Sequence, residues 1–130
     1  MPDDKKKKIY LIDDDEMHLT TAELYLKDEY EVHKANSGQE ALSYITGNKF
    51  IPHLVLLDIN MPNMDGWEVF KRLREIAFLK NVPIAFVTAS VEESGKKKAY
   101  KLGLADYIVK PFNMTDLKGR IKEILKKSKV

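Results

Sequence analysis

Short apolar runs alternate five times with longer stretches in which apolar residues recur at helical spacing. The runs predict five strands: Ile9 to Asp13, Tyr30 to Ala35, His53 to Asp58, Pro83 to Thr88 and Asp106 to Val109. The periodic stretches predict helices near residues 16–28, 38–47, 65–79, 91–102 and 113–127. Three of these helices begin next to residues that favour the N-cap position, namely Ser37, Asp65 and Asn113.

Three of the runs are apolar without alternation: Tyr10 to Ile12, Leu54 to Leu57 and Ile84 to Val87. Such runs are typical of parallel strands that are covered on both faces, whereas the other two runs look like edge strands. Strands that alternate regularly with helices form a parallel sheet with right-handed crossovers. The pattern therefore predicts a three-layer α/β fold.

Length and composition indicate one soluble globular domain. The 130 residues allow one proper core and are too few for two ordinary domains. No apolar stretch approaches the roughly 18 residues of a membrane span. The segment from Met1 to Lys8 has no apolar part that could act as a secretory signal, so we expect a cytoplasmic protein.

Charge and cysteine content exclude several classes of site. The net charge of +2 is too small to imply nucleic-acid binding, and we expect the lysine clusters to be solvated faces. The sequence contains no cysteine, which excludes disulfides, thiolate metal sites and cysteine nucleophiles.

Unusual polar residues stand at the ends of four predicted strands: Asp13 and Asp14, Asp58, Thr88 and Lys110. The ends of parallel strands meet at one rim of the sheet, where open α/β sheets bind their ligands. Carboxylates that leave water need a partner, and Mg²⁺ is the simplest candidate for a cluster of acids.

This set of residues suits phosphoryl transfer to a carboxylate. Asp58 would attack the phosphorus, Asp14 would bind Mg²⁺ directly, and Asp13 would bind it directly or through water. The backbone carbonyl of Asn60, two residues past Asp58, is a further candidate ligand.

Two more residues can stabilise the transferred group. Lys110 can place its ammonium against the phosphoryl oxygens, and the Thr88 hydroxyl can donate to another oxygen. The peptide bond between Lys110 and Pro111 could be cis or trans.

Four motifs occur in order over residues 8–127 and together resemble the receiver domain of two-component response regulators, including the chemotaxis regulators. They are Ile12-Asp13-Asp14, Leu57-Asp58-Ile59-Asn60-Met61-Pro62 with Asp65-Gly66, Val87-Thr88-Ala89, and Tyr107-Ile108-Val109-Lys110-Pro111-Phe112. The resemblance implies one receiver domain over residues 1–130, with a basic lead at 1–7 and a flavodoxin-like (βα)5 fold. Its parallel sheet would have the order 2-1-3-4-5.

The resemblance also implies roles for the site residues. A sensor histidine kinase or a histidine phosphotransfer protein would phosphorylate Asp58, with Mg²⁺ held by Asp13, Asp14, Asp58 and the carbonyl of Asn60. Thr88 and Lys110 would contact the phosphoryl group, and Ala89 would keep its surroundings small. We take Asp13 and Asp14 as the acidic pair because they follow the apolar run directly, which leaves Asp15 near the start of the first helix.

Signalling expectations follow from the same resemblance. Thr88 and Tyr107 would switch the surface formed by the fourth helix, the fifth strand and the fifth helix, and Asn60 and Ser90 would tune dephosphorylation. This lysine-rich surface suggests an acidic or mixed-charge protein target or effector domain, and it could also form a homodimer. We expect no direct contact with nucleic acid or membrane, and a switch that promotes only its own phosphorylation and dephosphorylation.

Three alternatives belong to other classes. A phosphohydrolase of the haloacid dehalogenase kind would need an aspartate where Asn60 stands and a cap domain that cannot fit in this length. A flavodoxin-like flavin binder would place a phosphate against the acidic run from Asp13 to Glu16, which would repel it. A degenerate receiver would act only by contact, although every position of the reactive set is filled.

Other conspicuous residues are expected to be structural or on the surface. These are Trp67, His33, His53 and His18, of which only His18 lies near the predicted rim. The sequence leaves open whether the domain stands alone or belongs to a longer regulator or hybrid kinase.

Overall fold

A computed structural model describes residues 6–89 and 93–128 and contains one parallel sheet of five strands. The strands are β1 (Lys7–Ile12), β2 (Tyr30–Ala35), β3 (Leu54–Leu57), β4 (Ile84–Thr88) and β5 (Asp106–Val109). Their order in the sheet is β2-β1-β3-β4-β5, and every neighbouring pair is parallel. This confirms the predicted sheet order, and it places the two predicted edge strands, β2 and β5, at the edges.

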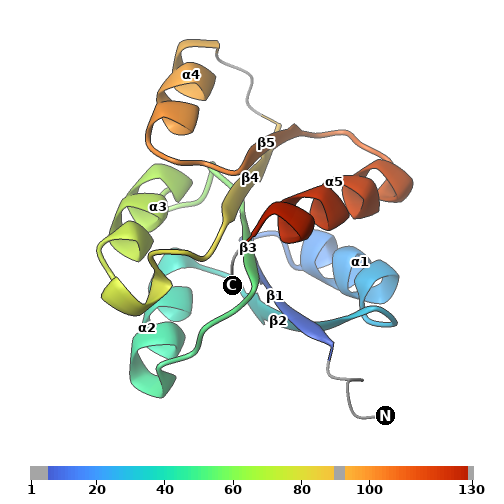
Figure 1. Cartoon of the computed structure of the whole chain (residues 1–130), viewed down its shortest axis with the longest axis horizontal. Coiled ribbons are helices and arrows are strands. Elements are labelled where there is room, and N and C mark those ends of the chain that lie inside the picture. The colour runs from blue at the N-terminus through green and yellow to red at the C-terminus, as the bar shows by residue number, and fades with distance from the viewer. Residues whose placement is uncertain (1–5, 90–92, 129–130) are drawn as a thin grey trace.

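Helices cover both faces of the sheet (Figure 1). They are α1 (Glu16–Leu26), α2 (Gly38–Asn48), α3 (Gly66–Arg74), α4 (Glu93–Lys101) and α5 (Met114–Lys127), with a short 3₁₀ helix, η2 (Ala77–Leu79), after α3. In Figure 1, α2, α3 and α4 lie on one side of the strands, and α1 and α5 lie on the other. The molecule therefore has the predicted three layers.

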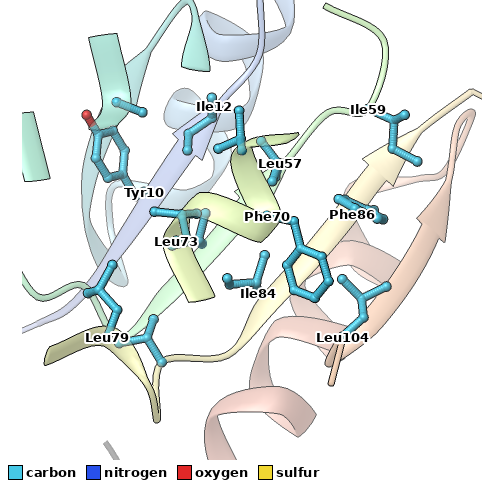
Figure 2. Packing of buried hydrophobic residues seen from close by; sticks show 14 of the residues in the cluster. Tyr10, Ile12, Leu57, Ile59, Phe70, Leu73, Leu79, Ile84, Phe86 and Leu104 are labelled. Carbon is cyan, nitrogen blue, oxygen red and sulfur yellow. The ribbon is translucent and has the colours of Figure 1, made fainter. Parts of the chain in front are cut away.

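Alternating residues of the central strands enter two separate cores, because successive side chains of a strand point to opposite faces. Ile84 and Phe86 of β4 pack with Phe70 and Leu73 of α3, as Figure 2 shows. Ala85, which lies between Ile84 and Phe86, instead joins the core under α1 and α5. Strands that serve two cores need apolar residues at every position, which explains their unbroken apolar runs.

Capping side chains fix where the helices begin. Ser37 caps α2, Asp65 caps α3 and Asn113 caps α5, as predicted, each by accepting a hydrogen bond from a backbone N–H of the first turn. Asp15 caps α1 in the same way. The loops that follow β1 and β3 therefore end at defined residues next to the carboxyl edge of the sheet.

The third helix is shorter than predicted. It ends at Arg74, and Ile76 has extended backbone angles (φ −84°, ψ 114°) before η2 begins. The Arg74 guanidinium donates to the carbonyls of Leu79 and Val82 beyond this break, which holds the chain in its new direction. The break lets Leu79 enter the core, where it is almost fully buried.

Candidate functional site

Three carboxylates meet at the carboxyl edge of the sheet. Asp13 and Asp14 follow β1, Asp58 follows β3, and these two strands pair in register with Ile12 opposite Leu57. Each of the three residues offers one oxygen, and these oxygens all lie within 4.8 Å of one another. Asp13 and Asp58 are buried, whereas Asp14 is exposed. The structure thus brings together the three acids that the sequence singled out.

Backbone contacts hold Asp58 in place. Its N–H donates to the carbonyl of Ile12 over 2.9 Å, so the sheet hydrogen bonding continues past the end of β3. On its other side, Gly66 opens α3 directly against the Asp58 carbonyl, and a Cβ at Gly66 would collide with that oxygen and with the Cα of Ile59. The Gly66 N–H donates to the Ile59 carbonyl over 2.8 Å.

Asp15, which follows Asp13 and Asp14 in the sequence, has different hydrogen-bond partners. Asp15 accepts hydrogen bonds from the N–H groups of Met17 and His18, and its own N–H donates to Asp13 Oδ1 over 2.9 Å. Asp15 therefore stabilises the start of α1, whereas Asp13 and Asp14 belong to the acidic cluster.

The charge on Asp58 is incompletely compensated. Burial raises the pKa of its carboxyl above the ordinary value, and the Lys110 ammonium opposes this effect. Asp13 and Asp14 raise the pKa further by like-charge repulsion, while the Asn60 N–H, 3.4 Å from Asp58 Oδ1, lowers it. A cation among the carboxylates would favour their charged forms.

The donor set suits a hard divalent cation. All three side chains offer carboxylate oxygens, the ligand type that Mg²⁺ prefers, and Mg²⁺ commonly completes its shell with water. The cluster could therefore hold a metal ion. No described contact tests whether the carbonyl of Asn60 takes part, and this role stays a prediction.

Lys110 reaches the site from the end of β5. Its Nζ lies 3.2 Å from Asp13 Oδ2 and 2.9 Å from His18 Nδ1. Within residues 6–89 and 93–128, no hydrogen bond or ion pair joins Lys110 to Asp58. The Lys110 N–H donates to the Thr88 carbonyl, and the bond between Lys110 and Pro111 is cis.

The remaining predicted residues lie along β4 and β5. Thr88 ends β4 and is fully buried, and Ala89 follows it as an exposed residue. Tyr107 of β5 is buried with its ring edge against Phe86, at a centroid distance of 5.9 Å. Ser90 lies outside the described residues. The roles of these residues in phosphoryl contact, switching and dephosphorylation stay predictions.

His18 is the site residue that the sequence reasoning undervalued. It lies in the first turn of α1, and its Nδ1 is 3.3 Å from Asp13 Oδ2 as well as 2.9 Å from Lys110 Nζ. Its position soon after the acidic pair was the only available signal. His53 instead accepts a hydrogen bond from the Lys8 N–H at the opposite end of the sheet, and Trp67 packs on Phe86, as expected of structural residues.

The surface made by α4, β5 and α5 is connected by polar side chains. Asp106 of β5 forms an ion pair with Arg120 of α5 at 2.9 Å and accepts a hydrogen bond from the Tyr100 hydroxyl of α4. The same hydroxyl accepts the N–H of Tyr107 over 3.1 Å. The backbone of Tyr107 is thereby linked to two helices of this surface.

Comparisons with known proteins agree on one family. The model of the response regulator receiver domain matches residues 9–122. The transcriptional regulatory protein PhoP of Bacillus subtilis, named for alkaline phosphatase synthesis, is 38% identical over 125 residues, which are 95% of this chain and 50% of PhoP. The chain spans about half the length of the curated relatives it matches.

Solved structures share the fold closely. The chemotaxis response regulator CheY4 of Vibrio cholerae superposes with a TM-score of 0.83 at 29% identity, covering 92% of this chain and 98% of CheY4. The phosphorylated cyanobacterial phytochrome response regulator RcpA gives a TM-score of 0.78 at 30% identity, covering 92% of this chain and 91% of RcpA. With its flavodoxin-like sheet and its acidic cluster, this chain belongs to the family of response regulator receiver domains.

Proposed function

We propose that Asp58 accepts a phosphoryl group in a Mg²⁺-dependent reaction and that the domain acts as a signalling switch. The observation that supports this most is the meeting of Asp13, Asp14 and Asp58 within 4.8 Å, with the Lys110 ammonium beside them. A purely structural role would not require the buried carboxylates of Asp13 and Asp58 to meet, because burying like charges together is costly.

Each residue has a defined part in this proposal. A carboxylate oxygen of Asp58 forms a bond to phosphorus while the bond to the donor breaks, and the donor leaves with the electron pair. Mg²⁺, held by Asp13, Asp14, Asp58 and the carbonyl of Asn60, would neutralise phosphoryl charge. Lys110 and Thr88 would meet the equatorial oxygens, and the small side chain of Ala89 would leave room for them.

The donor and the output are also proposals. The donor is a sensor histidine kinase or a histidine phosphotransfer protein, and the signal leaves through the surface of α4, β5 and α5. Lysines on α4 favour an acidic or mixed-charge protein target or effector domain, or a homodimer. Phosphorylation would shift the populations of Thr88 and Tyr107 conformers, and Asn60 and Ser90 would tune the return reaction. Among the helices of residues 6–89 and 93–128, none combines the length and the apolar character that a membrane span requires.

Intact-mass analysis tests the acceptor chemistry directly. The protein is incubated with acetyl phosphate, with and without Mg²⁺, alongside Asp58→Asn and the matched control Asp28→Asn. Asp28 is an exposed acid beyond the end of α1, and the acidic cluster lies at the start of that helix. We expect one added phosphoryl group in the wild type and the control, only with Mg²⁺, and none in Asp58→Asn. Absence of any gain in the wild type would leave a receiver that acts by contact alone.

A further inference from the structure

The Lys110 ammonium has two acceptors, and neither of them is Asp58. Its Nζ contacts His18 Nδ1 at 2.9 Å and Asp13 Oδ2 at 3.2 Å, and within the described ranges it has no hydrogen bond to Asp58. The Lys110 side chain is 19% exposed, so water competes little for its protons. The resting position of this lysine is therefore set by Asp13 and His18.

The chemistry of the contact between Lys110 and His18 assigns the donor and the acceptor. A lysine ammonium has three donors and no acceptor, so in the 2.9 Å contact with Lys110 Nζ the acceptor is His18 Nδ1. His18 Nε2 lies 3.5 Å from Asp15 Oδ2, so the second ring nitrogen also faces a carboxylate. His18 Nδ1 also lies 3.3 Å from Asp13 Oδ2, so the imidazole, the Asp13 carboxylate and the Lys110 ammonium form one connected group.

We propose that His18 is a positioning residue that retains the Lys110 ammonium beside Asp13 before phosphorylation and thereby slows the reaction. The inference rests on the proposed function, because it concerns the step in which Lys110 moves to the phosphoryl oxygens. Asp13 pulls on the same ammonium, but it is also a candidate metal ligand, and bound Mg²⁺ would weaken its attraction for a second cation. With Mg²⁺ bound to Asp13, His18 remains as the acceptor that restrains the Lys110 ammonium.

Phosphorylation kinetics test this role. We expect His18→Ala to take up the phosphoryl group from acetyl phosphate about threefold faster than the wild type, a modest gain because the His18 side chain is half exposed. His18→Asn places an amide oxygen near the position of Nδ1 and should restore a rate close to that of the wild type. Thr20→Ala, an exposed change on the same helix, should leave the rate unchanged.

A double-mutant cycle separates positioning from a general effect on the fold. In a Lys110→Ala background, His18→Ala should no longer change the slow residual rate, because the group that His18 retains is absent. The proposal is overturned if His18→Ala is as slow as or slower than the wild type, or if it accelerates the Lys110→Ala variant equally.

Nitrogen-15 NMR of the lysine ammonium groups gives a readout that needs no phosphorylation. The Lys110 signal, assigned by its loss in Lys110→Arg, should shift in His18→Ala and return toward the wild-type position in His18→Asn. An unshifted signal in His18→Ala overturns the proposal. If the wild type takes up no phosphoryl group, the proposed function fails, while this signal still decides whether His18 holds Lys110.

Discussion

Gly66 and Asp58 are in direct backbone contact: the first residue of α3 lies against the carbonyl of the proposed phosphoacceptor. The contact leaves no room for a side chain at Gly66, because a Cβ there would collide with backbone atoms that cannot rotate away. The packing of α3 and the placement of Asp58 therefore depend on the same residue.

Replacing Gly66 with alanine should affect both stability and reactivity. We expect Gly66→Ala to lower the free energy of unfolding by about 1–3 kcal/mol, the usual cost of overpacking, and to slow phosphorylation because the Asp58 loop must move. Gly119→Ala is the matched control: it lies within α5, its Cβ would meet open space, and it should stabilise the protein by about 0.5–1 kcal/mol. Urea denaturation measures the free energy of unfolding of both variants. An unchanged value in Gly66→Ala would contradict the packing argument.

Removal of Mg²⁺ should cost stability only when the acidic cluster is intact. At a Mg²⁺ concentration 100 times the dissociation constant, we expect a stabilisation of about 2.7 kcal/mol by mass action. Asp14→Asn should lose most of this gain. Asp15→Asn should keep it, because asparagine still caps α1 and Asp15 lies outside the cluster. Thermal unfolding with and without EDTA measures this stabilisation. If Asp14→Asn and Asp15→Asn lose it equally, the assignment of Asp13 and Asp14 as the acidic pair is refuted.

Stability should fall as the pH rises through the pKa of Asp58, because Asp58 is a buried acid. Because the folded-state pKa of Asp58 is raised above its ordinary value of 3.8, the folded protein binds this proton more tightly than the unfolded chain does. Without Mg²⁺, the wild type should lose stability relative to Asp58→Asn as the pH rises from about 4 through the raised pKa, and the gap should then stay constant.

Urea denaturation of the wild type and Asp58→Asn from pH 4 to pH 8 in EDTA measures this gap. We expect Asp58→Asn to be more stable by about 1 kcal/mol at pH 7, with the advantage shrinking toward pH 4. A wild type that gains on the variant with rising pH would show that the carboxylate is better compensated than the structure indicates.

Loss of the Lys110 ammonium should slow phosphorylation more than it changes the fold. We expect Lys110→Ala to reduce the rate with acetyl phosphate at least about tenfold, because one of the charges that meets the phosphoryl oxygens is missing. Lys97→Ala removes an equal charge from the exposed side of α4 and should react at the wild-type rate. The time course of intact mass distinguishes them, and equal rates would argue that Lys110 has no role in the chemistry.

The architecture could be predicted because each strong pattern has one physical cause. The unbroken apolar runs of β1, β3 and β4 follow from their burial between two helix layers, and Ser37, Asp65 and Asn113 act as caps through contacts within the first helical turn. The end of α3 was placed too far along because apolar spacing continues past Arg74. The break depends on Arg74 hydrogen bonds to carbonyls five and eight residues later, which no periodicity reveals.

The site was predictable where it depends on strand ends and was missed where it depends on long-range side-chain contacts. Asp13 and Asp58 follow paired strands, so a parallel sheet alone brings them together. His18 and Lys110 are 92 residues apart, and their contact depends on the turn of α1 that faces the end of β5. No local pattern encodes that meeting.

The crossovers on either side of the acidic cluster leave the sheet in opposite directions. After Asp13 and Asp14 the chain turns to α1 on one face, whereas after Asp58 it turns to α3 on the other, although β1 and β3 are neighbours. The entrance to the cluster is consequently bordered by two segments that share no helix layer. Insertions or deletions in one loop can therefore reshape one border of the entrance while the other border keeps its packing.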